Sequence, residues 1–255
     1  MMNEHIEVPL MSDLSDTFIS KLPESRRSAV HTAYANAPNY IVSIINRYCN
    51  KLSYIRNTKY RQDGFGNFIL NKYGERDKET CHYSQDGKYI AMHENMTNAE
   101  YVDVIEHELG HFIDDALGRP STDTIFSQAF ENVVARYNPD TLDGKRLLND
   151  MLDDAMSTGA AFDRNITDII SAITTNNTMV VQRFINENIS KRYFHHGDDY
   201  WKRLNVNGMP DETGKKETFA NLFAIETGGY RISVNFIERW FPELPIALQQ
   251  CIERA

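Results

Sequence analysis

The chain has 255 residues, enough for one sizeable core, and carries 27 basic against 36 acidic side chains, a net charge of −9. A hydrophobic fraction of 41% with 11% aromatic residues is typical of a globular protein and excludes a wholly disordered chain. The acidic balance argues against binding to nucleic acid or to an anionic membrane, since both require a basic face. Three cysteines without a CxxC pair argue against a disulfide scaffold and a cysteine-based zinc site.

The sequence shows neither a secretory signal at its N-terminal part nor a membrane-spanning stretch. The first twenty residues include four acidic side chains and lack the apolar run of a secretory signal. No stretch of the sequence stays apolar over the length that a membrane span needs. We therefore expect cytoplasmic synthesis and no membrane partner, while export by a route that reads no N-terminal signal stays open.

The elements expected before residue 95 are helices followed by a small sheet. Pro38 divides a helical pattern, because its ring removes a backbone donor and clashes with the preceding turn. Asp86-Gly87 favours a hairpin turn between β-prone flanks. In chain order we expect a loosely structured lead-in over 1–22, two helices within 23–50, a short strand near 65–70 and a hairpin over 83–89 whose second arm runs over 88–92.

The next helix has clear ends in the sequence. Thr97 and Glu100 match a capping box, in which each side chain satisfies the other residue's backbone donor. An apolar stripe of period near 3.6 follows, and Gly118 and Pro120 end the helix. The predicted class is α+β, helix-dominated, with a small sheet before this helix. Further helices are expected over 121–136, 143–158, 165–173, 178–190, 216–226 and within 233–254, with a polar loop over 205–215.

Inside this helix, residues 107–111 read His-Glu-Leu-Gly-His, the HExxH pattern. Residues four apart lie on one helix face, so the imidazoles of His107 and His111 can reach one ion. Neutral imidazole suits Zn²⁺, and a catalytic zinc site adds a third protein ligand and keeps a position for water. Glu108 lies one residue round the helix, where it can take a proton from that water. The pattern predicts metal-assisted attack on a carbonyl group.

The third ligand must come from the chain beyond residue 111. Glu217 opens a helix after a polar loop, and Ala220 is small enough to let that helix approach the metal closely. Asn221 lies one turn on from Glu217, where its side chain can hydrogen-bond a ligand. Glu226 is a rival ligand, although its position places it on the opposite helix face. The alternative to both is that Glu217 is an ordinary surface glutamate at a helix N-terminus.

An acidic residue near the imidazoles would set their tautomer. Asp114 lies three residues after His111 and seven after His107, so it is placed to accept an imidazole N–H. Asp115 is the alternative for this role, and a solvated helix end would account for both.

Two blocks of the sequence carry a resemblance to known peptidases. The first is His-Glu-Leu-Gly-His-Phe-Ile-Asp-Asp-Ala-Leu-Gly at 107–118, and the second is Glu-Thr-Phe-Ala-Asn-Leu-Phe-Ala at 217–224. They resemble the catalytic domain of anthrax lethal factor and related zinc peptidase domains of bacterial toxins and phage-encoded proteins, all of the gluzincin group. The resemblance implies a zincin-like fold and a zinc-dependent endopeptidase. Its ligands would be His107, His111 and Glu217, and Glu108 would be the general base.

The sequence departs from this group in three ways. His111 and Glu217 are 106 residues apart, more than expected for lethal factor, which implies an insertion. Asn221 stands where that relative has a carboxylate. A tyrosine expected shortly before the third ligand is missing from 205–216.

The resemblance also suggests how the chain is divided. We expect accessory helices over 1–60, packed on a zincin-like catalytic domain over 61–255, in one compact unit. In related peptidases an edge strand pairs with extended substrate, and 89–92 is the segment expected to do so here.

The missing tyrosine leaves open which group stabilises the oxyanion, where a donor is needed. The inserted segment offers His-His-Gly-Asp-Asp-Tyr-Trp at 195–201, and a similar block recurs in phage-associated members of the group. We expect His196 or Tyr200 to donate to the oxyanion, with Tyr200 or Asp168 otherwise supporting the site. The alternative is a polar loop in which Tyr200 and Trp201 are anchored in the core.

The leading hypothesis is a zinc endopeptidase that cuts a specific protein, as a bacterial toxin, an effector or a phage-encoded enzyme. Its partners would be a protein or peptide substrate, together with any delivery machinery or cognate inhibitor. The alternatives are a phage structural or assembly protein, a catalytically silent binding module, and a zinc hydrolase of another amide. Glu108 argues against the first two, since a structural site needs no base beside an open coordination position.

Overall fold

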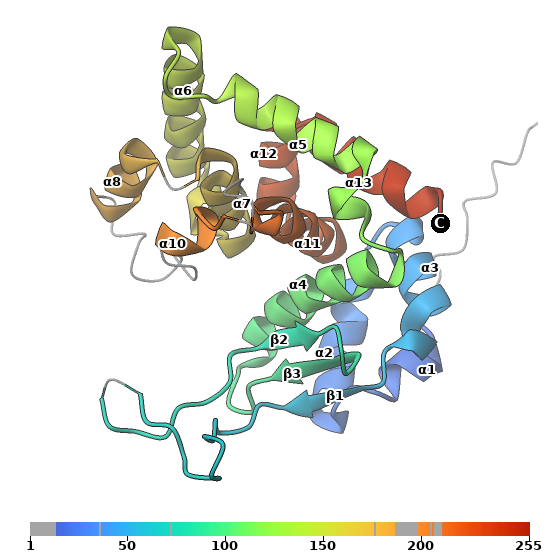
Figure 1. Cartoon of the computed structure of the whole chain (residues 1–255). Coiled ribbons are helices and arrows are strands. Elements are labelled where there is room, and N and C mark those ends of the chain that lie inside the picture. The colour runs from blue at the N-terminus through green and yellow to red at the C-terminus, as the bar shows by residue number, and fades with distance from the viewer. Residues whose placement is uncertain are drawn as a thin grey trace, which may run out of the picture.

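The computed structural model describes residues 14–35, 37–71, 73–175, 177–186, 198–204, 206 and 211–255. Most of these residues are helical, and three strands form one small sheet, which confirms the predicted helix-dominated α+β class. In Figure 1 the sheet and the first helices lie on one side of helix α4 (Asn98–Ala116), while most later helices lie on the other side.

The N-terminal helices are α1 (Asp16–Ile19), α2 (Glu24–Tyr34) and α3 (Asn39–Tyr48). Pro38 stands immediately before α3, so the predicted division of this region is confirmed. α1 is a short helix inside the segment expected to be a loosely structured lead-in. The apolar faces of α2 and α3 are buried in the main core and pack against α4.

The sheet has strand order β1-β3-β2, formed by β1 (Tyr54–Asn57), β2 (His82–Ser84) and β3 (Tyr89–Met92). β2 and β3 pair antiparallel, as the hairpin prediction required, and β1, which was not predicted, pairs parallel with β3. Because β3 has a partner on each side, the expectation that it offers a free edge to substrate is wrong. The edge next to α4 belongs to β2, which lines a cleft on α4.

The segment from residue 58 to residue 80, apart from residue 72, extends away from the sheet (Figure 1). Its extended stretches meet through isolated bridges such as Gln62 with Phe68 and Leu70 with Arg76. The strand expected near 65–70 therefore does not form. The physical reason is that Phe65 is 93% exposed and Leu70 58% exposed, so no apolar face is buried that would stabilise a strand there.

The capping box of α4 is present, since the Thr97 hydroxyl accepts from the Glu100 N–H and the Glu100 carboxylate accepts from the Thr97 N–H. The predicted helices after α4 are confirmed where the structure describes them, and Pro242 divides the last into two. They are α5 (Thr124–Arg136), α6 (Leu142–Thr158), α7 (Arg164–Thr174), α8 (Thr178–Asn186), α11 (Thr213–Gly228), α12 (Arg231–Trp240) and α13 (Glu243–Glu253). The short helix α10 (Asp198–Trp201) was not predicted.

α11 is the central helix of the fold. Its residues are buried almost without interruption from Glu217 to Thr227, because α4 and α7 pack along it (Figure 1). Where α4 and α11 cross, a Cβ added at Gly110 would lie 2.6 Å from the Cα of Ala220 and 2.8 Å from its carbonyl oxygen. Two small residues therefore let the backbones touch, as expected for Ala220 from the sequence.

This contact predicts that Gly110→Ala destabilises the protein. A methyl group at position 110 would meet backbone atoms that cannot rotate away, and overpacking of this kind costs about 1–3 kcal/mol. For a chain of this size we expect the melting temperature to fall by about 2–12 °C in thermal unfolding followed by circular dichroism. The control is Gly64→Ala, because a Cβ at Gly64 meets no atom within 4 Å. Equal melting temperatures for the two variants would contradict the prediction.

The predicted boundary at residue 60 separates segments that contact each other. β1 ends at Asn57, and its hydrogen-bonded partner β3 begins at Tyr89. The apolar residues of α2 and α3 belong to the same core as those of α4 and α11. Within the described ranges, no helix combines the length and the apolar character needed to cross a bilayer.

Candidate metal centre

α4 positions both imidazoles of the HExxH pattern on one face. His107 and His111 are one turn apart, and their Nε2 atoms are 3.1 Å from each other. The His107 side chain is only 5% exposed and that of His111 22% exposed. His107 is therefore buried below the surface, and His111 is the imidazole of the pair that solvent can reach.

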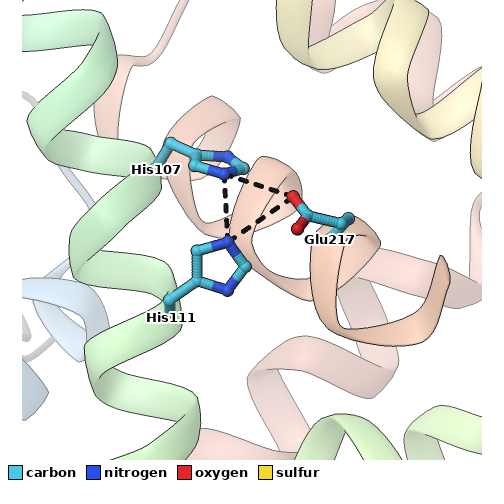
Figure 2. A group of neighbouring side chains, drawn as sticks. All are labelled: His107, His111 and Glu217. Atoms are coloured by element: carbon cyan, nitrogen blue, oxygen red, sulfur yellow. Dashed lines mark hydrogen bonds and ion pairs between the residues drawn. The ribbon is translucent and has the colours of Figure 1, made fainter. Parts of the chain in front are cut away.

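α11 brings the third side chain to the same point, as Figure 2 shows. Glu217 Oε2 is 3.3 Å from His107 Nε2 and 3.5 Å from His111 Nε2. The three ligand atoms lie within 4.8 Å of one another, so this buried group could bind a metal ion. Glu217 is 6% exposed, and the alternative of an ordinary surface glutamate is therefore wrong.

The charges of the group depend on one another. Burial disfavours a charge on His111, but the Glu217 carboxylate outweighs this effect and raises the pKa of His111 to about 9. Burial likewise opposes the charge on Glu217, yet the two imidazoles hold the pKa of its carboxyl well below the usual value. The carboxylate thus needs a positive charge beside it, which a proton on His111 or a bound cation can supply.

Asn221 orients one of the imidazoles. Its Oδ1 atom lies 2.8 Å from His107 Nδ1, inside the buried contact between α11 and α4. An amide oxygen can only accept, so Nδ1 carries the proton and the Nε2 lone pair faces Glu217 and His111. The position of Asn221 one turn after Glu217 predicts a hydrogen bond to a candidate ligand, and its contact with His107 is such a bond.

Glu108 faces a cleft of about 680 Å³ that His107, His111 and Glu217 also line. The backbone N–H of Tyr83 in β2 donates to Glu108 Oε2 at 2.7 Å. Tyr83 was not anticipated as part of the site. The sequence predicts that it lies on a hairpin, but nothing in the local pattern indicates that the hairpin edge meets α4 at Glu108.

Asp114 has a different partner from the predicted imidazole. Its two carboxylate oxygens accept from the backbone N–H of Ser121 at 2.8 Å and from the Ser121 hydroxyl at 2.6 Å. Asp115 accepts from the Tyr83 hydroxyl and from Lys88. No hydrogen bond joins either aspartate to an imidazole in the described part of the chain. The turn after α4 brings Ser121 back to Asp114. Both carboxylate oxygens then accept from Ser121, where the sequence predicted that Asp114 would accept an imidazole N–H.

Tyr200 lies beside the candidate metal group. Its hydroxyl donates to Glu217 Oε1, the oxygen that does not face the imidazoles. Asp168 is 2% exposed, and burial raises its pKa to about 8, although Arg164 opposes this shift; Glu217 adds to it. The structure thus brings Tyr200 and Asp168 close to Glu217. His196, the other expected oxyanion donor, lies outside the described residues.

Glu226, the rival third ligand, is turned away from the imidazoles. Its Oε2 atom accepts from the Tyr40 hydroxyl at 3.2 Å on the side of α11 that faces α3.

Comparison of the chain with protein-family models, with curated proteins and with solved structures gives no match.

Proposed function

We propose that the chain is a zinc-dependent endopeptidase with a zincin-like catalytic arrangement. The observation that carries the proposal is the convergence of His107, His111 and Glu217 beside Glu108 in one cleft. Two imidazoles and one carboxylate are a donor set that suits Zn²⁺ in catalytic sites, which leave a position for water. Asn221 supports this reading, because it directs the lone pair of His107 Nε2 toward the other two side chains.

Each residue then has a defined task in hydrolysis. Zinc held here would lower the pKa of water to about 7 and polarise the substrate carbonyl. Glu108 takes the proton from the attacking water and passes it to the leaving amine. The Tyr83 N–H holds Oε2 of this carboxylate, so Oε1 is the oxygen that moves the proton.

Tyr200 is the candidate donor to the oxyanion within the described chain. Its hydroxyl donates to Glu217 Oε1, next to the place where negative charge would develop on the oxygen of the attacked carbonyl. We expect Tyr200→Phe to lower kcat by about 10²-fold while zinc stays bound, because loss of one oxyanion donor has effects of this size. The measurement is kcat on a cleaved peptide together with zinc content by mass spectrometry. The same measurement on His196→Ala tests the other donor, and unchanged kcat in both variants would contradict the assignment.

Asn221 gives a test of the metal site that needs no substrate. Removing the acceptor with Asn221→Leu frees the His107 ring, and we expect zinc affinity to fall about 10- to 100-fold in competition with a chelator. Asn221→Asp keeps an oxygen acceptor at the same position and serves as the control, with affinity closer to that of the wild type. If Asn221→Leu binds zinc as tightly as the wild type, the hydrogen bond does not support a ligand.

The proposed function as a whole is tested with two measurements on the purified protein. Metal analysis should find one equivalent of zinc, and incubation with a proteome-derived peptide library should yield new termini detectable by mass spectrometry. Zinc without cleavage would favour a structural or binding role that keeps the metal. Cleavage of other amides but not of peptide bonds would favour the non-peptidase hydrolase. The biological setting we propose is a bacterial effector, toxin or phage-encoded enzyme.

A further inference from the structure

Arg164, the first residue of α7, lines the same cleft as Glu108 and the candidate metal group. Its side chain is half-buried, and its Nε atom is shielded from solvent without a hydrogen-bond partner. Among the described residues it forms no ion pair with a carboxylate. A guanidinium stays charged in proteins and presents up to five N–H donors, so this group is short of a negatively charged partner.

None of the nearby carboxylates forms an ion pair with Arg164 in the described part of the chain. Asp163, the N-cap of α7, accepts from the Asn165 N–H at 2.8 Å and from the Ser233 hydroxyl. Burial raises the pKa values of Asp103 and Asp168, and Arg164 offsets this only in part. Neither Asp103 nor Asp168 forms a hydrogen bond or an ion pair with Arg164 in the described chain.

The other cations of the cleft are in a different situation. Lys216 is within 3.4 Å of Glu212, one turn earlier on the same helix. Arg119 is exposed at the end of α4 and is free to be hydrated. Arg164 is thus the cleft cation whose donor is both buried and unused among the described residues.

Arg164 is the first residue of α7 and so lies in the first turn of that helix. The first turn of an α-helix carries a partial positive charge, so a cation there is unfavourable for stability. A residue that contradicts a local preference without an evident structural gain is expected at a functional position. The helix N-terminus and the guanidinium together make this part of the cleft attractive to an anion.

We propose that Arg164 determines substrate specificity by binding the carboxylate of an aspartate or glutamate side chain of the peptide in the cleft. Guanidinium and carboxylate match in two parallel hydrogen bonds, which is the strongest pairing available to this residue. The inference deepens the proposed peptidase function and rests on it. It assigns to the cleft a preference for acidic peptides, although the chain as a whole carries a net charge of −9.

The test is a cleavage profile on a proteome-derived peptide library. We expect the wild type to enrich aspartate or glutamate at one position relative to the cut. Arg164→Gln should lose this enrichment and cleave acidic peptides about 10- to 100-fold less efficiently, with neutral peptides unaffected. Arg164→Glu should favour lysine or arginine at that position. Arg119→Gln, on the same cleft but exposed, is the control and should keep the wild-type profile.

The outcomes separate the two proposals. A wild type that cleaves peptides without acidic enrichment overturns the role of Arg164 and leaves the peptidase function standing. A wild type that binds zinc and cleaves no peptide overturns both. Arg164→Lys keeps the charge and is made in parallel, with zinc content and melting temperature measured for every variant. An acidic enrichment retained by a folded, zinc-loaded Arg164→Gln also overturns the inference.

Discussion

Replacing Glu108 by glutamine is expected to reduce peptide cleavage by about 10²- to 10⁴-fold while one equivalent of zinc stays bound. Glutamine keeps the size of the side chain and an oxygen that can accept from the Tyr83 N–H, which lies 2.7 Å from Glu108 Oε2. It cannot take a proton from water. His107, His111 and Glu217 are unchanged in this variant, so the metal site remains. The measurements are kcat on a library-derived peptide and zinc content by mass spectrometry.

The matched control for this variant is Glu106→Gln on the same helix. Glu106 is 1% exposed, and burial together with Asp103 raises the pKa of its carboxyl well above the usual value. Glutamine there replaces a carboxyl whose charged form burial disfavours, and cleavage should persist. Undiminished cleavage by Glu108→Gln would rule out the proposed mechanism. Loss of zinc from that variant would instead show that Glu108 has a part in holding the metal.

The second large effect is expected at the third ligand. If zinc binds as proposed, zinc at about 1,000 times its dissociation constant would stabilise the folded wild type by about 4 kcal/mol and raise the melting temperature by roughly 8–16 °C. Glu217→Gln removes the anionic oxygen that faces both imidazoles at 3.3 and 3.5 Å. We expect this variant to purify without stoichiometric zinc and to show little thermal shift when zinc is added. Thermal unfolding with and without a chelator measures both properties.

Glu226→Gln is the control for this experiment, because Glu226 lies on the same helix and was the rival ligand in the sequence. Its side chain accepts from the Tyr40 hydroxyl, so its replacement should leave the zinc-dependent shift intact. If Glu226→Gln abolished the shift and Glu217→Gln kept it, the assignment of the third ligand would be wrong.

The sequence was most informative where chemistry and local structure coincide. The capping box, the apolar stripe and HExxH all lie on α4, so the helix and the orientation of its two imidazoles follow from spacing alone. The choice of Glu217 needed a tertiary argument, and the small residue Ala220 supplied it, since it meets Gly110 where the helices cross. Local rules sufficed in the first case and an argument about close helix packing in the second.

The sequence was less informative about contacts between segments of the chain that loops separate. Asp114 lies near both imidazoles in helical spacing, but the chain turns after α4 and offers it Ser121, a partner that spacing within one helix does not reveal. The segment 89–92 was expected at the edge of the sheet. The unpredicted strand β1 pairs with it and leaves β2 at the edge beside α4. Both errors concern contacts between segments joined by loops.

The backbone contact between Gly110 and Ala220 bears on which ions the site can accept. Because the two helices already touch, they cannot close further around a small cation. Their shared core equally prevents them from parting to admit a large one. The distances between the three candidate ligands can therefore change only by rotation of their side chains, and Asn221 restrains that of His107. The spacing of the three candidate ligands is thus set when the protein folds. A metal bound here would be selected by its ionic radius, because two residues with almost no side chain meet where the helices cross.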